Sequence, residues 1–297
     1  CDGDIDEDGE VLDGDLYYYD ADGDDLGVDD DTLTACDTPA GYVDNFYDCD
    51  DGDATEPVVV DNSLGSSSGS GTMSSPLDSI QDAVDRAYQC VIVFAGTYEE
   101  NVELDGSSID IWGVEGSEYT TIDPRGGRCE GSDPEGCLPT LSIASGSGST
   151  PSVHGFTITG GTGNISSSST TTTCADSSAS YSGTTECTVT VYDYCGGGVY
   201  VDGDDPILED LIIRDNLLPE FEQYVVNCTG GSACDFEQYW LYSYGGGICL
   251  KNSLAEINNV DLIDNYADQG GGLYVADGSI STISQSEVVE NQAEDGA

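Results

Sequence analysis

Positive charge is the scarcest property of this sequence. Only five of its 297 residues are Lys or Arg, against 59 Asp and Glu, and the formal net charge is −54. Internal salt bridges cannot neutralise such an excess, and a phosphate-binding surface needs a basic footprint that the chain does not have. Nucleic acid and anionic membrane surfaces are therefore poor partners, and cations are the natural ones.

Histidine and closely spaced cysteine pairs are scarce too. The only histidine is His154, and no two cysteines have the C-x-x-C spacing, which argues against zinc ribbons and thioredoxin-like motifs. The 12 cysteines, an even number, instead indicate disulfides in an oxidised, extracellular or cell-surface protein. Spacing alone does not fix the connectivity, but the candidate local bridges are Cys36 with Cys49, Cys129 with Cys137, and Cys228 with Cys234. Two N-glycosylation sequons, at Asn164 and Asn227, fit this setting, and their use stays open.

Long apolar runs are absent as well. None approaches the roughly 18 residues that suggest a transmembrane helix, so we predict no membrane span. No signal peptide is recognisable, and the chain begins with Cys rather than Met, which indicates a processed secreted product or a fragment.

Composition divides the chain into three parts. Residues 1–57 are rich in Asp, residues 58–76 read as a Gly/Ser linker that is flexible unless packed down, and residues 77–297 carry short apolar runs. Helical spacing of Ile80, Ala83 and Val84 predicts one helix, which Asp78 or Ser79 can cap. This is the only helix that the sequence indicates clearly.

An internal repeat is the strongest signal for the fold. Three segments each begin with three glycines, hold three short β-prone runs and end in Asn; they are residues 196–216, 245–265 and 270–291. Such a unit is one coil of a parallel β-solenoid, in which equivalent residues stack about 4.8 Å apart. The residues expected to form a hydrogen-bonded ladder between coils are Asn216, Asn265 and Asn291.

Two insertions interrupt the coils, at residues 162–195 and 217–244. Long loops inside a compact domain are usually functional or disordered, and local disulfides could keep these two ordered. The second insertion is rich in aromatic residues. Its candidate contacts for a glycan or protein ligand are Tyr239, Trp240 and Tyr242.

The stretches SIQDAVDRA, VIVFAGTYEENVEL and HGFTITGG resemble the N-terminal cap and first coils of the pectate-lyase-like right-handed parallel β-helix superfamily. With the GGG repeats, the resemblance covers residues 77–297. It implies an all-β, right-handed parallel β-helix with one N-terminal capping helix. It says little about function, because this fold hosts many activities.

The stretches CDGDIDEDG, YYYDADGDDLG and ACDTPAGYVDNFYDCDDGDATEP resemble an Asp-rich metal-binding motif of bacterial surface proteins, similar in style to thrombospondin type 3 calcium repeats. Carboxylates at alternate positions of a loop can converge on one Ca²⁺ ion, which takes six to eight oxygen ligands. We therefore predict a loop-rich module that binds several Ca²⁺ ions. Its candidate ligands are Asp4, Asp6, Asp8, Asp13, Asp20, Asp22, Asp24, Asp29, Asp48, Asp50, Asp51 and Asp53.

The alternative for this segment is a solvated acidic linker. Its regular spacing, its placed glycines, the run Tyr17–Tyr19 and the pair Cys36 and Cys49 argue against that alternative. We expect Asp4, Asp6, Asp8 and Asp13 to act on one ion. Changing one of them to Asn should weaken order in residues 1–57 and leave the β-helix folded.

Three functions remain open. The Asn-Thr-Asp, Gly-His-Gly and Arg-Ile-Lys signatures of polygalacturonase-type enzymes are missing, and a polyanion would repel a uronate substrate, so we do not expect an enzyme. We expect a calcium-stabilised structural or adhesive surface protein. The alternatives are a polysaccharide lyase or hydrolase, and a glycan- or protein-binding module that uses the aromatic insertion. No further coil follows Asn291, which indicates a longer natural chain or head-to-tail self-association into filaments.

Overall fold

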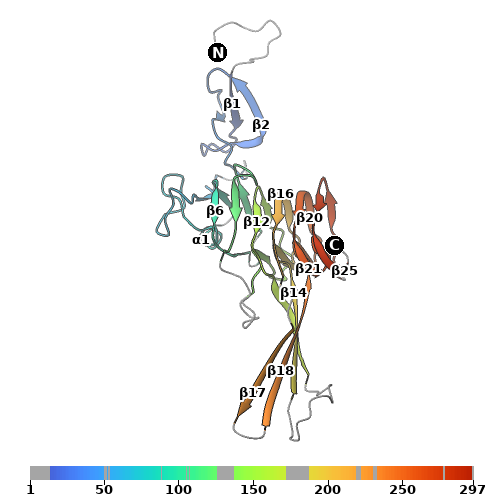
Figure 1. The fold of residues 1–297 in the computed structure, drawn as a ribbon. Helices are drawn as coiled ribbons and strands as arrows, with labels where there is room; N and C mark the ends of the chain where they lie inside the picture. The colour runs from blue at the N-terminus through green and yellow to red at the C-terminus, as the bar shows by residue number, and fades with distance from the viewer. Residues whose placement is uncertain are drawn as a thin grey trace. The chain divides into compact units, whose positions relative to one another are not determined.

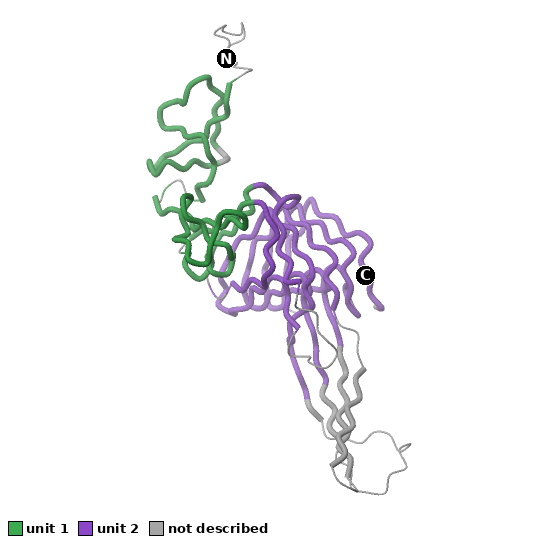
Figure 2. The backbone as a smooth tube through the Cα atoms, turned by 60° about the vertical axis from the view of Figure 1, so that its left-hand side comes forward, with its two compact units in different colours: residues 1–94, 109–114 green, residues 95–108, 115–297 purple. Residues whose placement is uncertain are grey.

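A computed structural model describes residues 14–49, 52, 54–87, 89–104, 106, 108–125, 137–171, 187–218, 222–229, 233–276 and 278–295. For some strand residues, among them 222–229 and 233–241, it describes the backbone alone. The chain forms two compact units, residues 1–94 with 109–114 and residues 95–108 with 115–297 (Figure 2). The boundaries drawn from composition stay a prediction. No helix in the described ranges is long and apolar enough to cross a membrane.

The first unit opens with a three-stranded antiparallel sheet in the order β2–β1–β3 (Figure 1). These strands are β1 (Asp15–Tyr19), β2 (Val28–Ala35) and β3 (Tyr42–Val43). The β-prone run Tyr17–Tyr19 lies in the central strand, and the Tyr17 side chain is buried. The segment that we predicted to be rich in loops therefore has a small sheet, with Asp-rich turns between its strands.

The same unit continues into parallel strands β4 (Val58–Val60), β5 (Cys90–Val93) and β8 (Asp110–Gly113), paired in that order. Helix α1 (Ile80–Val84) packs beside β4 and β5. The Ser79 Oγ accepts a hydrogen bond from the Asp82 N–H at 3.2 Å, and the side chains of Ile80, Ala83 and Val84 are buried. The predicted capping helix is confirmed, with Ser79 as its N-cap.

Residues 61–76, predicted to be flexible unless packed down, are packed down. The Gly65 N–H donates to the Asp61 carbonyl at 2.8 Å, and the Ser66 N–H donates to the Pro76 carbonyl at 3.1 Å. A Cβ atom on Gly69 would lie 2.0 Å from the Pro76 carbonyl oxygen. The glycines here permit close backbone packing, which composition alone does not distinguish from flexibility.

The second unit is a parallel β-solenoid. One sheet has the order β22–β19–β15–β10–β7, and a second pairs β6, β9, β12, β16 and β20 in parallel. Their bounds are β6 (Gly96–Tyr98), β7 (Val102–Glu103), β9 (Thr120–Ile122), β10 (Leu141–Ile143), β12 (Thr157–Thr159), β15 (Val199–Asp202), β16 (Ile207–Arg214), β19 (Ile248–Lys251), β20 (Glu256–Ile263) and β22 (Leu273–Val275). Strands β11 (Ser152–His154), β23 (Thr282–Ser284) and β24 (Glu287–Val289) extend the second sheet. The predicted all-β parallel β-helix is confirmed.

Equivalent residues of the repeats stack in register, as the repeat predicts. Val199 pairs with Ile248, and Ile248 pairs with Leu273. Gly245, the first glycine of its coil, has a positive φ of 64°. A Cβ on the next glycine, Gly246, would lie 2.5 Å from the Gly271 carbonyl oxygen. The triple glycine thus combines a left-handed corner with close stacking of neighbouring backbones.

The two insertions are β-hairpins rather than the loops that we predicted. Strand β13 (Asn164–Thr171) pairs antiparallel with β14 (Cys187–Cys195), and β17 (Glu222–Thr229) pairs antiparallel with β18 (Ala233–Tyr244). Strands β14 and β18 are parallel neighbours, so the hairpins form one four-stranded ribbon (Figure 1). Strands β21 (Tyr266–Gln269) and β25 (Gln292–Asp295) continue this sheet in the later coils.

The disulfides differ from the local pairs that the sequence suggested. Cys49 is bonded to Cys90, so the Cys36–Cys49 bridge is wrong, and Cys195 is bonded to Cys249. These bridges join cysteines that are 41 and 54 positions apart in the sequence. The spacing of neighbouring cysteines does not predict bonds between such distant positions.

The two other predicted bridges have a partial outcome. Cys36 and Cys137 are disulfide-bonded, each to a partner outside the described side chains. Cys129 lies outside the described residues, so its bridge to Cys137 stays a prediction. Cys228 lies opposite Cys234 in the β17–β18 register, and their bridge also stays a prediction.

Candidate metal centre

The turn from β1 to β2 brings Asp20, Asp22 and Asp24 together. One carboxylate oxygen from each of the three lies within 4.8 Å of the others. Backbone N–H groups of the turn donate to one oxygen of each side chain: Gly23 to Asp20 at 2.7 Å, Asp24 to Asp22 at 3.2 Å, and Leu26 to Asp24 at 2.8 Å. These bonds fix the three carboxylates toward one point, as the alternate spacing predicts.

Two oxygens of this cluster lack a protein partner. Asp22 Oδ2 and Asp24 Oδ2 are buried from solvent, and neither has a hydrogen bond within the described part of the chain. Burial raises the pKa of Asp24; the hydrogen bond from Leu26 opposes this rise, and the charges of Asp22, Asp20 and Glu56 add to it. A buried, unpaired carboxylate oxygen is costly, and a bound cation would remove both the cost and the repulsion. Hard oxygen donors of this kind fit Ca²⁺.

Of the remaining candidate ligands, the structure describes the side chain of Asp48 alone. Asp48 is buried, and its N–H donates to the Gly27 carbonyl at 3.1 Å, beside the end of the turn from β1 to β2. Asp29 lies in β2, and its side chain is outside the description. The candidates that lie outside the described residues altogether are Asp4, Asp6, Asp8, Asp13, Asp50, Asp51 and Asp53.

The three repeat asparagines form a continuous hydrogen-bonded column in the second unit. Asn216 Nδ2 donates to Asn265 Oδ1 at 2.9 Å, and Asn265 Nδ2 donates to Asn291 Oδ1 at 2.9 Å. Each Nδ2 also donates to a carbonyl of an earlier coil, that of Ile158, Ile213 or Leu262. Asn216 and Asn265 are fully buried, so these amide groups act between coils and are closed to a ligand.

Asp204 is a buried carboxylate whose structural role the sequence did not predict. It is 0 % exposed, and the loop of residues 145–149 wraps around it. Six groups donate to it: the N–H and Oγ of both Ser145 and Ser149, the N–H of Gly146 and the Oγ of Ser147. Burial alone would raise its pKa, but hydrogen bonds from Ser149 and Ser145 outweigh that effect and lower the pKa to about 2. The alternating SGSGS run was the available signal.

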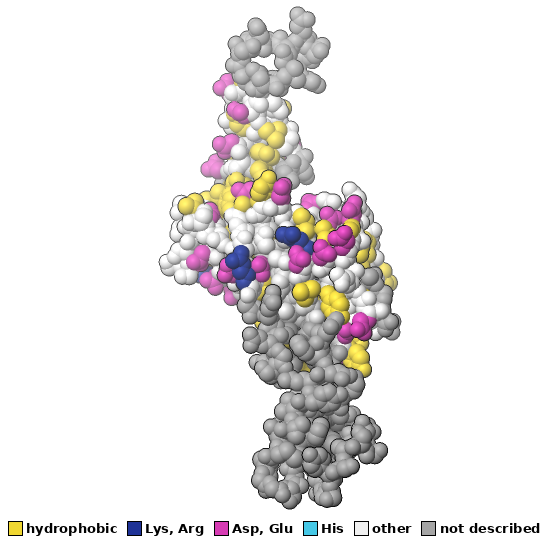
Figure 3. Space-filling model, viewed as in Figure 1, with side chains coloured by type: hydrophobic (Ala, Val, Ile, Leu, Met, Phe, Trp, Pro, Cys, Tyr) yellow, Lys and Arg dark blue, Asp and Glu magenta, His cyan; other side chains and the backbone are white. Residues whose placement is uncertain are grey.

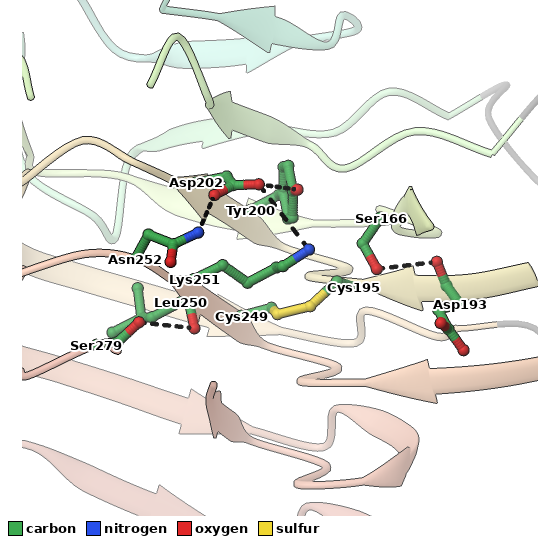
Figure 4. The surroundings of a disulfide bond; sticks show 10 residues. All are labelled: Ser166, Asp193, Cys195, Tyr200, Asp202, Cys249, Leu250, Lys251, Asn252 and Ser279. Atoms are coloured by element: carbon green, nitrogen blue, oxygen red, sulfur yellow. Dashed lines mark hydrogen bonds and ion pairs between the residues drawn. A yellow bond between two sulfur atoms is a disulfide. The ribbon is translucent and has the colours of Figure 1, made fainter. Parts of the chain in front are cut away.

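A disulfide anchors the base of the hairpin ribbon to the solenoid (Figure 4). It joins Cys195, the last residue of β14, to Cys249 in β19, and both are buried. Nearby, the Tyr200 hydroxyl donates to Asp202 Oδ2 at 3.1 Å, and Lys251 Nζ lies 3.9 Å from the same carboxylate (Figure 4). Burial raises the pKa of Tyr200 well above its usual range, and the charge of Asp202 adds to this.

The predicted aromatic ligand contacts lie on β18. Tyr242 is 46 % exposed and lies opposite Asp193 of β14. The positions of Tyr239 and Trp240 in the strand are described, but their side chains are not. On the face drawn in Figure 3, acidic side chains are spread widely and basic ones are few.

Comparisons with known proteins add little to these observations. No protein-family model matches the sequence, and no curated protein matches it. A crystal structure of a pectin methylesterase in complex with hexasaccharide VII is similar at 14 % identity and a TM-score of 0.37, over 80 % of this chain and 68 % of the esterase chain. A likeness of this size carries no argument about activity. The chain is a parallel β-helix by its own strand pairing.

Proposed function

We propose that this protein is an extracellular, calcium-stabilised structural or adhesive surface protein. The convergence of Asp20, Asp22 and Asp24, with buried oxygens that no group among the described residues satisfies, is the observation that carries this proposal. Ca²⁺ would supply the positive charge that the chain lacks and would hold the β1–β2 turn closed. Disulfides such as Cys49–Cys90 fit an oxidising compartment.

A structural rather than catalytic role is part of the proposal. The polar groups of the asparagine column and of Asp204 form hydrogen bonds within the stack of coils. Such groups stabilise stacking and are not exposed to a substrate. Cleavage or de-esterification of a polysaccharide by the purified protein would replace this proposal with the enzymatic alternative.

End-to-end self-association also belongs to the proposal. Strands β23 and β24 expose Ile283 and Val288, whose exposed fractions are 49 % and 57 %. An apolar solenoid face with open strand edges favours pairing with another coil. We expect filaments or head-to-tail oligomers by electron microscopy in calcium, and uniformly short particles at all concentrations would argue against assembly.

Glycan binding is a second candidate function, favoured by the exposure of Tyr242. Aromatic faces stack on sugar rings, and a neighbouring carboxylate such as Asp193 accepts hydrogen bonds from hydroxyls. Replacing Tyr242 with Ala should abolish any binding found on a glycan array. Binding that survives this change would place the contact elsewhere.

Calorimetric calcium titration of the metal-free protein tests the main proposal. We compare the wild type with Asp22→Asn/Asp24→Asn, in which two carboxylates become neutral isosteres. The matched control, Asp215→Asn/Asp264→Asn, removes the same charge from exposed positions of the second unit. The first variant should lose one bound ion and part of the calcium-dependent rise in Tm. Equal stoichiometry in all three proteins would show that the Asp turn is not a metal site.

A further inference from the structure

Residues 45–49 lie between the metal turn and the parallel strands of the first unit. On the side of the turn, Asn45 Nδ2 donates to the Asp25 carbonyl at 3.0 Å. The Asp48 N–H donates to the Gly27 carbonyl at 3.1 Å. Both acceptors belong to the loop that positions the three carboxylates, so the segment follows any movement of that loop.

On the other side, the same segment packs against β5, β8 and the residue that follows β5. The Phe46 ring centroid lies 5.5 Å from that of Trp112 in β8, and the Tyr47 ring lies 5.5 Å from that of Phe94. Cys49 is bonded to Cys90, the first residue of β5. Strand β5, to which this segment is bonded, is buried at all four positions.

We propose that metal binding in the Asp20–Asp24 turn is coupled to the packing of residues 45–49 over Trp112. The inference rests on the proposed metal site. Without an ion, repulsion among three converging carboxylates opens the turn and displaces the carbonyls of Asp25 and Gly27. Asn45 and Asp48 lose their acceptors, and the Phe46 ring loses its fixed place. The Cys49–Cys90 bond keeps the segment tethered, so ion loss loosens the packing without releasing it.

Coupling of this kind is reciprocal. If the ion tightens the packing of Phe46, then removal of the Phe46 ring must weaken ion binding by the same factor. A separate metal turn, connected to the strands by chain alone, would not respond to a change at Phe46. Weaker ion binding after a change at Phe46 therefore distinguishes a metal site that is coupled to residues 45–49 from an independent one.

The first test follows Trp112 fluorescence in the full-length protein. A Trp240→Phe background leaves Trp112 as the single tryptophan, since the chain has two. Calcium should reduce acrylamide quenching of Trp112 by about 2-fold, because ring contact shields the indole. Asp22→Asn/Asp24→Asn should abolish this response, whereas Asp215→Asn/Asp264→Asn should retain it.

The second test measures calcium affinity after a change at Phe46. Phe46→Ala should weaken the affinity of the Asp-turn site by about 5-fold. Phe46→Leu, which preserves most of the apolar volume, should give a smaller loss and guards against misfolding of the alanine variant. Leu64→Ala, at a residue 78 % exposed in the same unit, is the control and should leave affinity unchanged.

Two outcomes overturn different statements. If Asp22→Asn/Asp24→Asn binds as many ions as its control, the metal site itself is wrong and the coupling falls with it. A second outcome would refute the coupling and leave the metal site standing. In it, the Asp22→Asn/Asp24→Asn variant loses an ion, but calcium does not change the quenching of Trp112 and both Phe46 variants bind calcium with wild-type affinity.

Discussion

Asp204 gives the sharpest stability prediction, because its environment is completely described. Changing Asp204 to Asn keeps the size of the side chain and removes its charge. It also turns one carboxylate oxygen into an NH₂ group. The donors that now bind Oδ2, the N–H groups of Ser145 and Gly146, would then face another donor. The loop of residues 145–149 should lose its anchor on the coil that begins at residue 196.

The pKa of Asp204 sets the size of the effect. A fall from 3.8 to about 2 on folding corresponds to about 2 kcal/mol of stability from the charged form. This contribution is fully present above about pH 5 and is lost as the pH falls toward 2, because the unfolded chain takes up the proton in that range while Asp204 in the folded protein stays charged. Unpaired donors in Asp204→Asn add about 1–3 kcal/mol. We expect a total loss of about 3–5 kcal/mol at pH 7.

Urea unfolding of metal-free protein measures this loss, with Asp215→Asn as a control of equal charge at an exposed position. Other carboxylates also titrate between pH 4 and 2. The quantity to follow is therefore the difference between the wild type and Asp204→Asn, in which their contributions cancel. This difference should shrink by about 2 kcal/mol between pH 5 and pH 2. A difference that is independent of pH, or a midpoint equal to that of Asp215→Asn, would refute the reasoning.

Three further substitutions test the coil stack by the same urea assay. Asn265→Ala removes four side-chain hydrogen bonds from the buried column and should cost about 3–5 kcal/mol, and a loss below 1 kcal/mol would contradict the ladder. Gly246→Ala should cost more than Gly116→Ala, because its Cβ would meet two carbonyl oxygens at 2.5 Å, whereas Ala at Gly116 would meet no atom within 4 Å and bear only the strain of a φ of 88°; the reverse order would contradict close stacking. Cys195→Ser/Cys249→Ser should cost about 4 kcal/mol by loop entropy, and an unchanged midpoint would mean that the bond does not constrain the unfolded chain.

The sequence predicts those parts of the fold whose determinants are local or strictly repeated. The helix follows from Ile80, Ala83 and Val84, which share one face within two turns. The coils follow from a glycine triplet and a terminal asparagine that recur in the same order in three segments of nearly equal length. In both cases the residues that interact occupy equivalent positions of a pattern, so the pattern along the chain reports a contact in space.

The sequence does not predict contacts between segments that share no repeated pattern. Asp204 receives its hydrogen bonds from residues 55 to 59 positions away, and Cys90 is bonded to a cysteine 41 positions away. The two hairpins were read as loops because they interrupt the repeated pattern of the coils. Their strands are stabilised by pairing between successive insertions, which neither insertion reveals alone.

The turn that holds Asp20, Asp22 and Asp24 is predicted from the sequence only in part. Alternate Asp residues with a following glycine predict that Asp20, Asp22 and Asp24 converge, because the spacing is local. The spacing does not predict the aromatic contacts of Phe46 with Trp112 and of Tyr47 with Phe94. This turn is hydrogen-bonded to Asn45 and Asp48, whose neighbours Phe46 and Tyr47 pack on Trp112 and Phe94.

The placement of charge at the coil corners explains how so acidic a chain can stack in register. Each repeat asparagine is preceded by an acidic residue with a positive φ: Asp215 at 55°, Asp264 at 53° and Glu290 at 56°. All three acids are exposed, whereas Asn216 and Asn265, which follow them, are buried. Coils about 4.8 Å apart bring identical residues together, and a buried column of carboxylates would repel itself at that distance. Neutral amides bond to one another there instead. The left-handed residue turns the charge outward, where water, salt and Arg214, 3.9 Å from Asp215, reduce the repulsion.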